Sequence, residues 1–158
     1  MELYTDAVEG NGYFDSRYTC DLDNSSPELR WKEIPDGAVC FAMLAEDPDA
    51  PKGVFTHWVI FNIPVSVHHL PAGIPAQESL PNGIRQGLNS AGKLGYAGPC
   101  PPLGDKPHRY TFRLFALRAF PEIPHRASRE QLLEAINSVI ITTAEVTGRY
   151  QRAMLKAG

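Results

Sequence analysis

The chain has 158 residues, of which 43% are hydrophobic and 21% are charged, and its formal net charge is −3. A chain of this length suits one domain, and it can bury roughly 70% of the surface it exposes when unfolded, so its stability requires neither disulfides nor metals. We therefore interpret residues 1–158 as a single domain. Its pI of about 5.9 lacks the basic charge that nucleic-acid binding requires, so no nucleic-acid partner is expected.

The cysteines and the apolar runs predict the compartment. Cys20, Cys40 and Cys100 are odd in number and lack the CxxC spacing of a metal site, and the residues after Met1 do not form a signal peptide. We therefore expect a cytoplasmic protein with reduced thiols. The longest apolar run, Val39 to Ala45, is far shorter than the roughly 20 residues of a membrane-spanning helix, so no membrane span is expected.

Turn residues divide the first two thirds of the chain into short windows. Glycine and proline make up 27 of the 158 residues, above the usual share of roughly 12%, which favours a turn-rich β protein. Three windows free of proline predict strands: Ala38 to Asp47, Phe55 to Ile63, and His108 to Phe120. The first is continuously apolar, as a central strand buried on both faces would be, whereas the other two alternate.

The final third predicts a helix, because no proline follows Pro124. Ser128 and Gln131 have the spacing of a capping box, and apolar residues recur behind them at helical spacing. These features predict a helix from Arg129 to Thr143, followed by a short strand from Gly148 to Arg152. The whole pattern predicts a mostly β fold, an antiparallel β-sandwich with a C-terminal helix.

Two histidines each lie at or near the start of a predicted strand. Alternation places His57 on one face with Phe55, Val59, Phe61 and Ile63, and it places His108 on one face with Tyr110, Phe112 and Leu114. The segment from Asp47 to Gly53 suits a hairpin between the first two strands, which would bring Asp47 and Asp49 near His57. The plainer alternatives are an Asx turn for the two aspartates and core positions for the histidines.

The loop from Gly95 to Pro107 is dense in prolines and has few backbone amides to offer. Amides left unpaired, such as those of Gly98 and Cys100, could face a cavity and bind an anion. The alternative is a stiff connection between strands. One X-Pro bond, here or near Asp47, could be cis.

Several segments together resemble the phosphatidylethanolamine-binding protein family. They are Asp47-Pro48-Asp49-Ala50-Pro51, His57-Trp58-Val59, Gly98-Pro99-Cys100-Pro101-Pro102 and His108-Arg109-Tyr110. The stretches from Asn24 to Trp31 and from Leu88 to Tyr96 are similar to its prokaryotic, Raf-kinase-inhibitor-like branch. The resemblance extends over almost the whole chain.

The resemblance implies a β-sandwich with a small, preformed pocket for phosphate and other anions. The implied ligand-binding residues are Asp47, Asp49, His57, Gly98, Cys100, Pro101, His108 and Tyr110. It also implies a regulator of kinases or serine proteases rather than an enzyme, with no metal or other cofactor, and a homodimer. Animal members have glycine where this chain has Cys100, and they continue into a further C-terminal helix.

Protonated histidines would supply the positive charge of such a pocket. An imidazole beside a carboxylate favours its charged form, so anion affinity should fall as the pH rises above the histidine pKa. The alternatives are a hydrolase or other enzyme that uses the Asp and His residues, with Cys100 as nucleophile activated by His108, and a metal site. A further possibility is protein recognition through the long loop from Leu70 to Asn89, where His68 and His69 are expected to be solvated.

Overall fold

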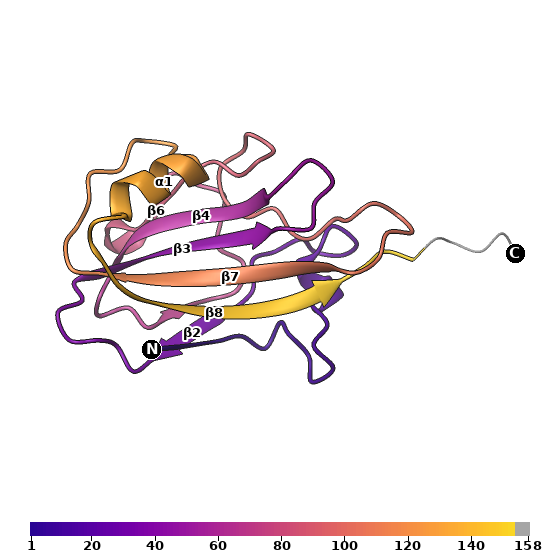
Figure 1. The fold of residues 1–158 in the computed structure, drawn as a ribbon, viewed down its shortest axis with the longest axis horizontal. Coiled ribbons are helices and arrows are strands. Elements are labelled where there is room, and N and C mark those ends of the chain that lie inside the picture. The colour runs from indigo at the N-terminus through magenta and orange to yellow at the C-terminus, as the bar shows by residue number, and fades with distance from the viewer. Residues whose placement is uncertain (154–158) are drawn as a thin grey trace, which may run out of the picture.

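The structure is a computed structural model that describes residues 1–153, and it contains two antiparallel sheets (Figure 1). The smaller sheet has the order β1 (Glu2–Tyr4), β2 (Leu29–Lys32), β5 (His69–Leu70). The larger sheet has the order β6 (Arg85–Gln86), β4 (Phe55–Pro64), β3 (Cys40–Asp47), β7 (His108–Leu117), β8 (Ile140–Tyr150). With the helix α1 (Arg129–Ile136) and 3-10 turns at Ser16–Tyr18 and Pro81–Gly83, they confirm the predicted β-sandwich with a helix.

The larger sheet is covered on both faces, and β3 lies at its centre. All eight residues of β3 are buried, as its continuous apolar run predicts. On one face Phe41 and Met43 pack in the core between the two sheets. On the other face Ala42 and Leu44 belong to a core completed by α1, which Figure 1 shows on the side of the large sheet away from β2.

The predicted hairpin between β3 and β4 is confirmed, with Asp47 opposite Phe55 at its open end. The pairing is interrupted near that end, because Ala45 lies opposite Trp58 while Glu46 lies opposite Thr56. His57 is therefore the extra residue of a β-bulge. Bulges are common next to binding sites because they re-aim a side chain.

The bulge corrects the predicted alternation of β4. Val59 and Phe61 pack in the core beside α1, whereas His57 lines a cavity on the other side, where Trp58 and Ile60 belong to the core between the sheets. The expectation that His57 shares a face with Val59 and Phe61 is thus wrong. Along β7, which has no such irregularity between His108 and Ala116, the predicted alternation is confirmed.

The helix is shorter and the last strand longer than predicted. The capping box at Ser128 is confirmed, but α1 ends at Ile136, and β8 pairs with the whole length of β7. The helical spacing continues past Ile136 by coincidence, because Ile140 to Thr143 are all β-branched residues, which suit a strand. At its other end, β7 stops at Leu117 rather than Phe120.

Two further expectations concern the backbone. Within residues 1–153 no helix is long and apolar enough to cross a membrane. The peptide bonds of this part of the chain are all trans, so the cis X-Pro bond that the sequence left open is not found.

Candidate functional site

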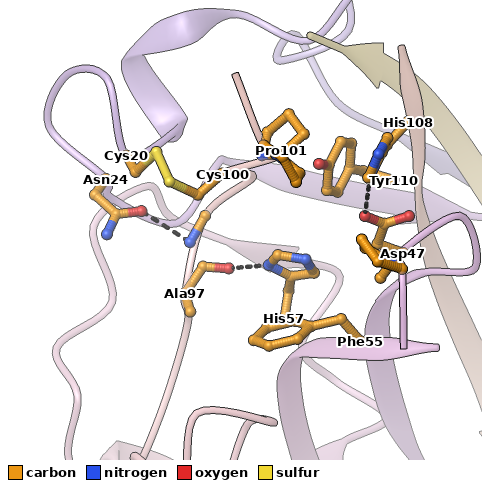
Figure 2. A pocket seen from close by; sticks show the side chains of 14 residues that line it. Cys20, Asn24, Asp47, Phe55, His57, Ala97, Cys100, Pro101, His108 and Tyr110 are labelled. Atoms are coloured by element: carbon orange, nitrogen blue, oxygen red, sulfur yellow. Dashed lines mark hydrogen bonds and ion pairs between the residues drawn. A yellow bond between two sulfur atoms is a disulfide. The ribbon is translucent and has the colours of Figure 1, made fainter. Parts of the chain in front are cut away.

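A cavity of about 380 Å³ lies where the end of β3 meets the beginnings of β4 and β7, and Figure 2 shows the side chains around it. Of the eight predicted ligand-binding residues, seven line this cavity: Asp47, His57, Gly98, Cys100, Pro101, His108 and Tyr110. Cys20, Asn24, Phe55 and Ala97 also line it, and no sequence pattern singles them out as site residues.

Asp47 forms the buried carboxylate of the cavity. Its Oδ1 accepts a hydrogen bond of 2.8 Å from the amide of Asp49, and its Oδ2 lies 2.7 Å from Nδ1 of His108 (Figure 2). The Asx turn and the aspartate–histidine pair, which the sequence offered as alternatives, are both present. The turn fixes the carboxylate so that its second oxygen faces His108.

His108 is held between two carboxylates. Its Nδ1 faces Asp47, and its Nε2 lies 3.2 Å from Oδ2 of Asp105. Since an ionised carboxylate only accepts hydrogen bonds, both contacts are satisfied when both ring nitrogens carry a proton. Burial by itself lowers the pKa of His108, but the hydrogen bonds from Asp47 and Asp105 outweigh it and raise the pKa. The two contacts and the raised pKa therefore favour the imidazolium form of His108.

His57 is in the opposite electrostatic situation. Its Nδ1 lies 2.5 Å from the carbonyl oxygen of Ala97, which can only accept, so Nδ1 carries the proton. Burial lowers the pKa of His57, despite the opposing effects of the Ala97 carbonyl and the Asp47 carboxylate. Neutral His57 thus has a lone pair on Nε2, the nitrogen that is turned away from Ala97 in Figure 2.

Tyr110 stands between the two histidines. Its ring centroid is 5.3 Å from that of His57, in an edge-to-face arrangement, and 6.4 Å from that of His108, in a stacked one. Burial, followed by the charge of Asp47, raises the pKa of Tyr110. The hydroxyl therefore stays protonated and can donate a hydrogen bond to a ligand.

The rim of the cavity contains a disulfide between Cys20 and Cys100, whose Cα atoms are 5.4 Å apart. The expectation of reduced thiols is therefore wrong for these two residues, which are separated by 80 positions in the sequence. No local spacing indicates a pair so far apart. Cys40 is free and buried, and burial raises the pKa of its thiol to about 11, so it is unreactive at neutral pH.

Gly98 joins this rim to the N-terminal segment rather than facing the cavity with its amide. The amide donates to Oδ1 of Asn24 at 2.8 Å, which corrects the suggestion that it is unpaired. A Cβ at Gly98 would lie 2.3 Å from that oxygen and 2.4 Å from the carbonyl oxygen of Tyr18, so only glycine fits. Among the hydrogen bonds formed by residues 1–153, none uses the amide of Cys100, which is therefore open to a ligand.

Asp49 is the one predicted site residue outside the cavity. Its carboxylate accepts from the amide, Nε and Nη2 of Arg109, at 2.9, 3.0 and 2.8 Å. This hydrogen bonding, opposed by partial burial, lowers the pKa of Asp49 to about 2. Asp49 lies in an outer cleft of about 550 Å³ that borders the other side of His108 and also contains Asp105, Lys106 and Arg149.

Together, the fold and the cavity define a β-sandwich protein with a pocket at one end of its larger sheet, lined by two histidines, an aspartate and a tyrosine. The sequence profile of the phosphatidylethanolamine-binding protein family matches residues 4–151, and the chain belongs to this family. A UPF0098 protein of Methanothermobacter thermautotrophicus is 46% identical over 152 residues, which cover 96% of this chain and 99% of that protein.

Two solved structures have the same fold. The phosphatidylethanolamine-binding protein homolog CT736 of Chlamydia trachomatis is 34% identical, with a TM-score of 0.85, over 96% of this chain and 97% of that one. YbcL of Escherichia coli, described as a member of the mammalian PEBP family, is 32% identical, with a TM-score of 0.86, over 95% and 97% of the two chains.

Proposed function

We propose that the cavity binds an anionic, phosphate-bearing group, and that the protein acts by binding rather than by catalysis. The observation that carries the proposal is the set of hydrogen-bonding groups that line one small cavity. They are the hydroxyl of Tyr110, the amide of Cys100 and Nε2 of His57.

The tautomer of His57 indicates which protonation state binds. A phosphate monoester that retains one proton can donate it to Nε2 of His57, while its other oxygens accept from Tyr110 and Cys100. A protonated His57 and a fully ionised phosphate form the same complex with the proton on the other partner. Since the second pKa of a phosphate monoester is about 6, affinity should fall as the pH rises above neutrality.

Two features support a binding role over an enzymatic one. The sulfur of Cys100 is bonded to Cys20, so it has no thiolate to act as the nucleophile that the sequence left open. In the Asp47–His108 pair, the other ring nitrogen of His108 contacts the carboxylate of Asp105. A catalytic pair would instead contact a hydroxyl or thiol that it could activate as a nucleophile.

We also propose the kinds of biological partner that the family resemblance implies. A phosphate-bearing small molecule or a phosphorylated group would occupy the cavity, and the regulated protein would be a kinase or a serine protease. Part of the loop from Leu70 to Asn89 lines an apolar groove of about 520 Å³, which is a candidate contact surface for such a partner. A homodimer and a cytoplasmic location also stay predictions, and the disulfide is more typical of oxidising compartments or of thermophiles.

The substitution Tyr110→Phe tests the proposal, because it removes one hydroxyl and keeps the ring that packs against His57. A hydrogen bond to a charged group is worth enough that affinity for inorganic phosphate should fall about tenfold. Tyr4→Phe is the matched control, since Tyr4 lies on the smaller sheet, where its hydroxyl donates to the carboxylate of Glu2. Calorimetric titration from pH 6 to 8 measures both variants.

Equal affinities of wild type and Tyr110→Phe, or no decline with rising pH, would contradict the proposed mode of binding. His108→Ala is a poorer test than Tyr110→Phe. It would leave the buried Asp47 carboxylate without its counter-charge, and such a loss costs about 3–5 kcal/mol of stability.

A further inference from the structure

Asp105 contacts the functional histidine from outside the cavity. Its Oδ2 lies 3.2 Å from Nε2 of His108, the nitrogen that is not used by Asp47. The side chain of Asp105 is 41% exposed, whereas that of His108 is only 6% exposed. A buried cation is thus paired with one buried and one exposed carboxylate.

This arrangement makes the site electrically unfavourable for an anion. Asp47 and Asp105 together carry two negative charges, and the imidazolium of His108 compensates only one. Two guanidinium groups lie near the site, and both already have a carboxylate partner. Arg109 pairs with Asp49, and Arg152, whose Nη1 lies 3.6 Å from Sγ of Cys100, pairs with Asp21. His57 is neutral near neutral pH, because burial lowers its pKa, and Tyr110 is an uncharged phenol.

We propose that the carboxylate of Asp105 competes with a bound anion for the imidazolium of His108. This competition determines the affinity of the cavity and the ligand charge that it prefers. The carboxylate of Asp105 is the counter-charge of His108 in the free protein. A bound anion takes over that role, and the Asp105 side chain turns away from His108 within the outer cleft that it lines with Lys106 and Arg149. This inference rests on the proposed anion-binding function.

The loop around Asp105 suits such an exchange. Two hydrogen bonds hold its backbone. The amide of Asp105 donates to the carbonyl oxygen of Pro102 at 3.2 Å, and the amide of Gly104 donates to the carbonyl oxygen of Arg152 at 2.9 Å. The exposed side chain can therefore change rotamer without moving the loop, which is a fast and local motion. The ligand must supply the negative charge that replaces this carboxylate, so an anion is favoured over a neutral ligand.

The substitution Asp105→Asn tests the inference with inorganic phosphate as the probe. Asp47 keeps its hydrogen bond with Nδ1 of His108 in both proteins. Removing one negative charge near the ligand should then tighten phosphate binding by about tenfold. Asp36→Asn is the matched control, because Asp36 is an exposed residue in the turn before β3, at the end of that strand far from the cavity.

Nuclear magnetic resonance titration of the His108 ring supplies a readout that needs no ligand. The pKa of His108 should fall in Asp105→Asn, because one of its two carboxylates is lost, and it should be unchanged in Asp36→Asn. An unchanged pKa in Asp105→Asn would show that the contact does not act on His108, which overturns the inference.

The binding outcomes separate the inference from the proposed function. If wild type binds phosphate and Asp105→Asn binds it equally or more weakly, the inference is overturned while the function stands. If only Asp105→Asn binds, the competitor is stronger than proposed here and the inference is supported. If neither protein binds at pH 6, the proposed function fails, and the inference fails with it.

Discussion

Glu46 and Asp47 are adjacent buried carboxylates at the end of β3, and alternation points them to opposite faces of the larger sheet. Glu46 is 8% exposed and accepts hydrogen bonds from Arg113 on β7, at 2.5 Å, and from Arg129 on α1. Asp47 is 4% exposed and is paired with His108 beside the cavity. One position along the strand separates two different roles.

The difference lies in the partners rather than in the burial. Arginine stays charged at any physiological pH, so the ion pairs of Glu46 tie α1 to the sheet under all such conditions. Burial lowers the pKa of Arg129, but Glu46 outweighs it and the net pKa is raised. Histidine titrates near neutral pH, so the pair beside the cavity responds to protons and to ligands.

The largest expected effect concerns the rim of the cavity. The double substitution Cys20→Ser/Cys100→Ser opens a loop of 80 residues, which should lower the free energy of unfolding by roughly 4 kcal/mol. Urea denaturation measures this loss. A dithiol reductant should destabilise wild type by a similar amount and leave the double variant unchanged. If the reductant affects neither protein, the disulfide does not form.

The next effect concerns the face of the sheet that carries α1. Glu46→Gln keeps the shape of the side chain but removes the carboxylate charge that pairs with Arg113 and Arg129, of which Arg129 keeps a contact of 3.5 Å with Glu130. The free energy of unfolding should fall by about 3 kcal/mol, while phosphate affinity should stay within twofold of wild type. Urea denaturation and phosphate titration on the same protein test both statements. A large loss of affinity would mean that the two faces are coupled.

The smallest effect is the pH dependence of the cavity side. The pKa of His108 in the folded protein is raised above the ordinary value of 6.5. Its stabilising contribution is therefore fully present below pH 6.5 and is lost as the pH rises through the raised value. His57 acts oppositely: its folded pKa is lowered, so stability falls as the pH drops below 6.5.

Urea denaturation between pH 6.5 and 8 isolates the contribution of His108, because Cys40 begins to affect stability only near pH 9. The decline should be present in wild type and in Glu46→Gln, and absent in His108→Gln. A decline of the same size in His108→Gln would assign it to another group.

Much of the fold could be predicted because its strands are separated by turn residues. The strand from His108 alternates regularly, and so the faces of Tyr110 and Phe112 were predicted correctly. The strand from Phe55 contains a bulge at His57, and a bulge depends on pairing with β3 rather than on local composition. The residues after Ile136 became a strand because β7 offers them a partner for their backbone hydrogen bonds.

The sequence by itself determined the class of fold, the polar residues that gather at one end of the sheet and the prolines that stiffen its loops. Only the tertiary structure decided which groups meet. It joins Cys20 to Cys100 in a disulfide, pairs Asp49 with Arg109 and brings the carboxylate of Asp105 into contact with His108. The physical reason is that strand period and turn chemistry are local, whereas a hydrogen bond between distant segments depends on the packing that brings them together.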